Sequence, residues 1–112
     1  MRFKVVLVPF QFDDLSGQKV RPAVCLTEAI GAHRHVVIAF ITSTVPGALE
    51  ATDILLTPGT PEFTPTGLRV VSTLRLHRMV TVTTKIIRRQ LGVLAPATCA
   101  AIDTRLRTLF AI

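Results

Sequence analysis

Three segments in the first half of the chain are apolar and rich in β-branched residues, which is typical of buried strands. They span residues 3–12, 21–26 and 35–44. The third segment has the highest β-propensity and is closed by Pro46-Gly47, so we expect it to lie at the centre of a sheet. Residues 13–18 are polar and contain Gly17, which indicates an exposed loop that joins the first two segments into a hairpin.

Prolines and glycines interrupt residues 57–67 so often that only short strands fit around them. We expect strands at residues 53–56, 68–71, 73–76 and 79–83, then a helical turn over 84–90 and a last strand at 91–94. From Pro96 onward, apolar residues recur at three- and four-residue steps, which predicts an amphipathic helix that lies on the sheet. Several short strands and one helix indicate a mainly β fold with a closed, curved sheet.

The length of 112 residues corresponds to a single domain, residues 1–112. No apolar stretch is long enough for a membrane helix, and Asp13-Asp14 stand where a signal peptide would have small residues, so we expect a cytoplasmic protein without membrane contact. Cys25 and Cys99 lie far apart in apolar segments with no adjacent His or basic residue, which predicts core thiols.

The positive charge is concentrated in the second half of the chain. Residues 1–62 contain five Lys or Arg against six acids, whereas residues 63–112 contain eight against Asp103 alone. A basic domain of this size attracts polyanions, so RNA, DNA or an acidic protein are candidate partners. A solvated positive face that only keeps the protein in solution is the alternative interpretation.

Metal binding has little support in the sequence. His33 and His35 alternate, but no Cys or carboxylate stands near them at ligand spacing. Asp13 and Asp14 are adjacent, so their side chains diverge and a role in capping the loop is favoured over paired acid catalysis. We therefore expect neither a metal nor another cofactor.

Five segments occur in an order and spacing that one protein family shares. The apolar run at residues 5–14 leads into an Arg-Pro-Ala motif at 21–23, followed by Ala-Phe-Ile-Thr-Ser at 39–43. Residues 72–80 and 88–92 complete the set. Together these segments resemble the MazF/PemK/Kid family of toxin–antitoxin ribonucleases, and the resemblance covers nearly the whole chain.

This resemblance implies an SH3-like β-barrel that forms a homodimer. It also implies a metal-independent endoribonuclease that cuts single-stranded RNA through the 2′-hydroxyl of the substrate and thereby inhibits translation and growth. An acidic cognate antitoxin would block that activity.

The resemblance also assigns roles to four residues. Arg21 matches the active-site arginine of the family, and its guanidinium can bind two phosphate oxygens at once. Thr42 matches a hydroxyl residue that orients the scissile phosphate. Arg75 and His77 match an arginine and, two residues later, an aspartate that acts as base in Kid-like members.

His77 thus replaces the family's acid. Because a neutral imidazole with a pKa of about 6.5 can accept a proton near neutrality, the exchange is compatible with catalysis. The alternative is a histidine that is hydrogen-bonded at a strand end or dimer seam. Arg75 and His77 share a face if their segment is extended, but which group acts as base and which as acid stays open.

Further residues are candidates for RNA binding. The loop that covers the RNA groove in the family corresponds to Gln11, Asp13, Ser16, Gln18 and Lys19. Ser43 can substitute for Thr42, and the basic cluster of Lys85, Arg88 and Arg89 can extend a phosphate track.

Two other functions are compatible with the same fold. Related toxins poison gyrase without being enzymes, but they depend on a carboxyl-terminal tail with Trp, and this chain contains no Trp. A catalytically silent RNA-binding barrel would need only the basic half.

Overall fold

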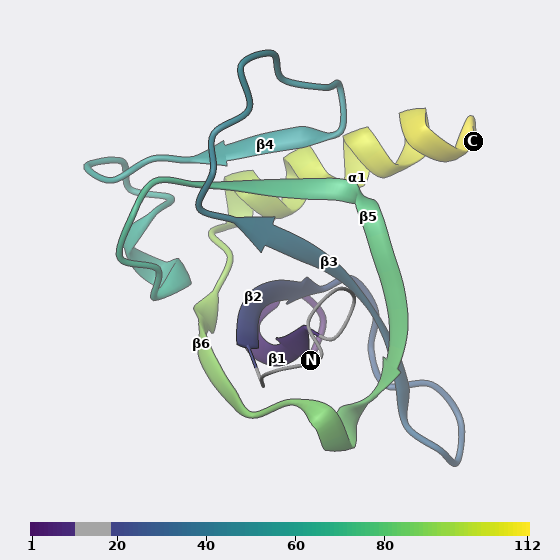
Figure 1. The fold of residues 1–112 in the computed structure, drawn as a ribbon. Coiled ribbons are helices and arrows are strands. Elements are labelled where there is room, and N and C mark those ends of the chain that lie inside the picture. Colours follow the sequence, from purple (N-terminus) through teal and green to yellow (C-terminus); the bar gives the residue numbers. More distant parts are fainter. Residues whose placement is uncertain (11–18) are drawn as a thin grey trace.

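The computed structural model describes residues 1–10 and 19–112, and a six-stranded antiparallel sheet forms most of it (Figure 1). The strands are β1 (Lys4–Phe10), β2 (Lys19–Cys25), β3 (His35–Thr42), β4 (Asp53–Leu56), β5 (Ser72–Thr83) and β6 (Arg89–Val93). They are ordered β4-β5-β3-β2-β1-β6. Two short 3-10 turns, η1 (Thr64–Thr66) and η2 (Thr84–Ile86), precede β5 and β6, and the chain ends in α1 (Pro96–Phe110).

The sheet curls around the centre of the molecule, and α1 lies beside β4 and β5 (Figure 1). This architecture confirms the predicted mainly β fold with a carboxyl-terminal helix. The central position of the strand that begins at His35 and the strand at Asp53–Leu56 are also confirmed. In the described ranges, no helix is long and apolar enough to cross a membrane.

Two sequence predictions about the strands are wrong. Residues 68–71 form no strand, because nearby side chains form hydrogen bonds with their backbone groups. The Leu68 N–H donates to Thr66 Oγ1, and the Val70 carbonyl accepts from Ser72 Oγ. The two short strands expected at 73–76 and 79–83 are one continuous strand, β5. A register shift opposite Ala39–Ile41 of β3 accommodates the bend of β5 without breaking it.

The end of the sheet also differs from the prediction. The helical turn expected over residues 84–90 is limited to η2, and the last strand begins at Arg89 rather than at Leu91. Arg89 is therefore a strand residue that pairs with Leu7 of β1.

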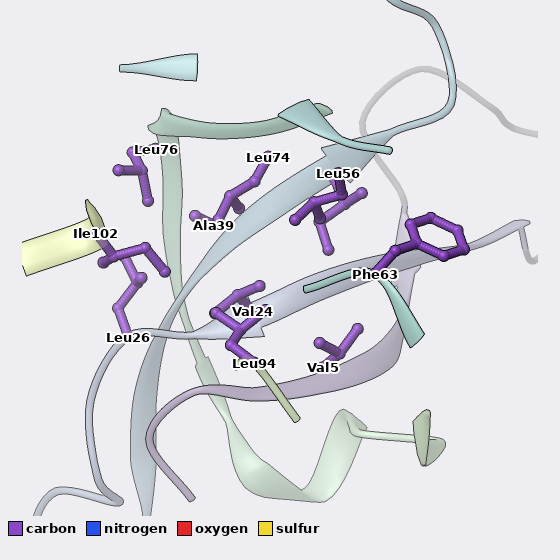
Figure 2. Packing of buried hydrophobic residues seen from close by; sticks show 11 residues of the cluster. Val5, Val24, Leu26, Ala39, Leu56, Phe63, Leu74, Leu76, Leu94 and Ile102 are labelled. Carbon is purple, nitrogen blue, oxygen red and sulfur yellow. The ribbon is translucent and has the colours of Figure 1, made fainter. Parts of the chain in front are cut away.

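The main hydrophobic core lies between the sheet and α1 (Figure 2). Ala39 and Ile41 from β3 and Leu74 and Leu76 from β5 contribute to it, and Ile102 enters it from α1 with no exposed surface. A smaller cluster contains Val6, Val8, Ala23, Cys25, Val36 and Ile38. The prediction of core thiols is confirmed for Cys25, and burial raises the pKa of both Cys25 and the half-buried Cys99.

Polar contacts attach α1 to distant parts of the chain. Arg2 forms an ion pair with Asp103, with 2.6 Å between Nη2 and Oδ1. Arg105 donates from Nη1 to the carbonyl oxygen of Ala51 at 2.6 Å, in the turn that leads into β4. The helix therefore holds this turn as well as covering the core.

Two glycines permit the close approach of β6 to the loop around η1. A Cβ atom on Gly92 would lie 2.1 Å from the carbonyl oxygen of Pro65, and one on Gly67 would lie 2.1 Å from that of Leu91. Gly67 also has a φ of 73°, which side chains rarely adopt. Backbone would therefore have to move to accept any side chain at either position.

We predict that Gly92→Ala lowers the free energy of unfolding by about 2 kcal/mol or more, because the backbone around Pro65 must shift. Gly47→Ala is the matched control, since a Cβ atom there meets nothing within 4 Å. Urea denaturation of the two variants measures the difference. Equal stability of both variants would show that the contact between β6 and η1 is not tight.

Candidate functional site

A groove with a volume of about 430 Å³ lies where β2, β3 and β5 come together with the loop before β5. Its lining contains cationic, hydroxyl and apolar side chains. They are Val20, Arg21, Pro22, Phe40, Ile41, Thr42, Ser43, Thr44, Leu68, Arg69, Val70, Ser72, Arg75 and Arg78. The volume is in the range of small-ligand sites in proteins.

The register between β2 and β3 brings Arg21 and Thr42 to the same groove. Ala23 pairs with Phe40, and continuing this antiparallel register by two residues places Arg21 opposite Thr42. Arg21 is exposed and donates from Nη1 to the carbonyl of Val20 at 3.4 Å. Two residues that are far apart in the sequence thus line one surface.

The hydroxyl of Thr42 is fixed by its neighbours. Thr42 Oγ1 accepts a hydrogen bond from the backbone N–H of Thr44 at 3.1 Å. Since a hydroxyl that accepts one hydrogen bond still has its own proton, Thr42 can donate to an oxygen atom in the groove. Ser43, the proposed substitute, is exposed on the same lining.

Arg75 reaches the groove from β5. Thr73 pairs with Thr42, and Arg75 follows two residues later on the same face of the strand. Asp53 of β4 pairs with Arg75 and accepts from its Nε at 2.9 Å and from its Nη2 at 3.2 Å. Burial would raise the pKa of Asp53, but hydrogen bonds from Arg75 and from the Glu50 N–H outweigh it, so the pKa is lowered and the carboxylate stays ionised.

The groove is strongly cationic. Four arginines line it, and none of the lining residues in the described ranges is acidic. Arg69 and Arg78 belong to this set, and sequence reasoning did not select them. Phe40 and Val70 add apolar surface, which a nucleobase can contact. The arrangement therefore fits a ligand that combines negative charge with flat apolar rings.

His77 lies outside this groove. It lines a separate small hollow together with Glu50, Ala51, Thr52 and Arg75, and its Nδ1 is 2.6 Å from Thr52 Oγ1. Arg75 is thus the residue that the two hollows share. The structure brings Arg21, Thr42 and Arg75 together and leaves His77 at the neighbouring surface.

Of the other candidate RNA-binding residues, those that the structure describes lie away from the groove. Gln11, Asp13, Ser16 and Gln18 lie outside the described residues. Lys19 is exposed at the start of β2. Lys85 on η2, Arg88 between η2 and β6, and Arg89 at the start of β6 are also exposed. None of these basic residues is among the described side chains that form the groove.

The two alternating histidines find no third metal ligand among the described residues. The rings of His33 and His35 are 6.0 Å apart, measured between their centroids. Within residues 1–10 and 19–112, no group of three His, Cys, Asp or Glu side chains could hold a metal ion.

Comparisons with solved structures show the same fold in several toxins. One is Mycobacterium tuberculosis toxin MazF-mt6, with 24% sequence identity, a TM-score of 0.69 and coverage of 97% of both chains. Another is the MazE–MazF complex (form II) from Deinococcus radiodurans, with 18% identity, a TM-score of 0.74 and coverage of 98% of this chain and 94% of the other.

A third similar structure is a mycobacterial endoribonuclease in complex with its cognate antitoxin. It has 20% identity and a TM-score of 0.69, and the match covers 100% of this chain and 95% of the other. At these identities the likeness establishes the fold. No curated protein matches the chain.

A family model gives the more specific result. The model that describes the PemK-like, MazF-like toxin of type II toxin–antitoxin systems matches residues 1–110. This match spans every described strand and the helix. The chain therefore belongs to the PemK-like, MazF-like family of type II toxin–antitoxin toxins.

Proposed function

We propose that this protein is an endoribonuclease that cleaves single-stranded RNA in the groove formed by Arg21, Thr42 and Arg75. The observation that carries the proposal is the convergence of these three side chains, from three strands, on one cationic surface. The MazF-like family and the printed description of one structural neighbour as an endoribonuclease support the same activity.

The groups in the groove suit attack by the 2′-hydroxyl on the adjacent phosphate. Negative charge accumulates on the phosphate oxygens in the transition state, and guanidinium groups stabilise it through paired N–H donors. We assign this role to Arg21 and Arg75, with Arg21 also able to donate a proton to the departing 5′-oxygen. The proton of the attacking 2′-hydroxyl passes to water, because the described residues of the groove include no carboxylate or imidazole, and water returns a proton to Arg21. Thr42 orients the phosphate, and the products are a 2′,3′-cyclic phosphate and a 5′-hydroxyl.

The proposal includes the partners that a toxin of this family needs. We infer that the active form is a homodimer in the cytoplasm and that an acidic antitoxin inhibits it by covering the basic groove. Charge complementarity supports the second inference, because the groove carries four arginines. Two structural neighbours are themselves toxins bound to antitoxins.

The direct test is incubation of the purified protein with a mixed-sequence single-stranded RNA in excess chelator. We expect the RNA to be cleaved, and we expect end-group analysis to identify 2′,3′-cyclic phosphates on the products. RNA that is retained without products would indicate a silent binding protein. A supercoiling defect in DNA with intact RNA would indicate a gyrase poison, and either result would overturn the proposal.

We predict that Arg21→Ala lowers the cleavage rate by about 10²- to 10³-fold, because charge in the transition state loses a preorganised donor. Arg21→Lys should recover only part of the rate, since an ammonium group cannot bind two phosphate oxygens in the same way. Lys85→Ala is the control outside the groove. Cleavage by Arg21→Ala at the rate of the control would remove Arg21 from the mechanism.

Arg69 and Arg78 should contact phosphates that flank the cleaved one. Each contact releases counterions, so Arg78→Ala should weaken RNA binding and reduce the slope of log K against log salt by about 1. Arg89→Ala, on β6 and outside the groove, should change the slope less. Binding of a 2′-O-methyl RNA, which lacks the attacking hydroxyl, measures both. A larger effect of Arg89→Ala would place the phosphate track on β6 instead.

A further inference from the structure

A buried carboxylate lies directly behind the groove, and none of the functional assignments above uses it. Asp53 is only 3% exposed, and its side chain is completely covered. Oδ1 accepts from Arg75 Nε, and Oδ2 accepts from both Arg75 Nη2 and the backbone N–H of Glu50, the latter at 2.8 Å. The Arg75 side chain is 23% exposed, so the pair joins a buried anion to a cation on the groove surface.

A carboxylate next to an active-site arginine could act as a general base or as a support. A base must reach the proton that it removes, within hydrogen-bond distance. Asp53 has no exposed side-chain surface, and both of its oxygens are already occupied. The hydrogen bonds that lower its pKa also make it a weak acceptor for a substrate proton.

We infer that Asp53 is a positioning residue, which holds the guanidinium of Arg75 in the orientation that contacts the RNA phosphate. This inference rests on the proposed ribonuclease function. A guanidinium that uses Nε and one edge of Nη2 for a carboxylate presents its remaining N–H groups on the opposite edges. Arg75 lines the groove with this fixed group, so a phosphate meets donors that need no reorientation.

The support of Asp53 extends through the fold to the helix. The turn before β4 is closed by a hydrogen bond from the Asp53 N–H to the Glu50 carbonyl at 3.0 Å. The Thr52 carbonyl accepts from the Leu76 N–H at 3.0 Å, and the Ala51 carbonyl accepts from Arg105 of α1. Asp53 is therefore anchored by β5 and α1, on the side of Arg75 away from the substrate.

Asp53 can affect cleavage through its negative charge or through the orientation that it gives to Arg75, and the variant Asp53→Asn distinguishes the two. Asp53→Asn removes a negative charge from behind a cationic groove, so a purely electrostatic effect would leave RNA binding unchanged or tighter. The loss of one carboxylate oxygen frees Arg75 from its paired contact, which lowers the rate of cleavage. We expect kcat to fall about tenfold or more, while KM stays equal or decreases.

The matched control is Asp103→Asn, which breaks an exposed aspartate–arginine pair at the helix, outside the groove. It should leave kcat and KM at wild-type values. Equal kinetics of Asp53→Asn and Asp103→Asn would overturn the inference, as would a rise in KM at unchanged kcat. If Asp53→Asn does not fold, Asp53→Glu keeps the charge and displaces it by one methylene; a folded Asp53→Glu with full kcat would also overturn it.

One measurement is independent of cleavage. In ¹⁵N-labelled wild-type protein, the Nε–H signal of Arg75 should be protected from exchange, and 2′-O-methyl RNA should shift the signals of its Nη groups while the Nε–H stays protected. Rapid exchange of the Arg75 Nε–H in the free protein would contradict positioning by Asp53. If the protein cleaves no RNA but this signal behaves as expected, the proposed function fails while the Asp53–Arg75 contact stands.

Discussion

The antiparallel register of β3 with both of its neighbours is the constraint on which the site depends. Pairing with β2 brings Arg21 near Thr42, and pairing with β5 brings Thr73, and with it Arg75, to the same face. Because side chains alternate along a strand, a slip of one residue in either pairing would turn one of these groups toward the core. The buried side chains Ile41 and Leu74, which also pair, oppose such a slip.

The fold gathers several arginines on one surface and neutralises one of them, Arg75, with a buried carboxylate. Four arginines line the groove, and no acidic residue is among the described residues of its lining, so the arginine charges repel one another. Asp53 compensates Arg75 from behind, where it is covered by protein, and leaves the front of the groove positive. A polyanion can therefore supply the missing negative charge, as the proposed binding of RNA and of an acidic antitoxin requires.

Sequence patterns predicted the elements whose signals are local. The strand at Asp53–Leu56 and the helix from Pro96 agree with the structure because turn residues delimit the first and a regular apolar spacing marks the second. Residues 68–71 were assigned to a strand because their apolar content does not reveal that Thr66 and Ser72 bind their backbone groups. The continuity of β5 depends on a register shift opposite β3, and no local sequence pattern predicts this shift.

The candidate site also contains residues that the sequence identifies and residues that only the fold reveals. Arg21, Thr42 and Arg75 were selected through the family resemblance, and they line one groove. Arg69 and Asp53 lie outside the matched segments, and their positions follow from the loop before β5 and from the pairing of β4 with β5. Arg78 lies within the matched segment, on β5, but the resemblance assigned no role to it. The position of Arg69, three residues before the matched segment 72–80, is the sequence signal that could have identified it. His77 shares a strand with Arg75, yet it faces Thr52 in a separate hollow, which spacing alone does not reveal.

The most direct test of the account is the structure of this protein with a bound 2′-O-methyl RNA oligonucleotide. The account predicts a phosphate within hydrogen-bond distance of Arg21, Thr42 and Arg75, with the flanking phosphates toward Arg69 and Arg78. RNA bound across η2 and β6, at Lys85 and Arg89, with an empty groove would contradict it.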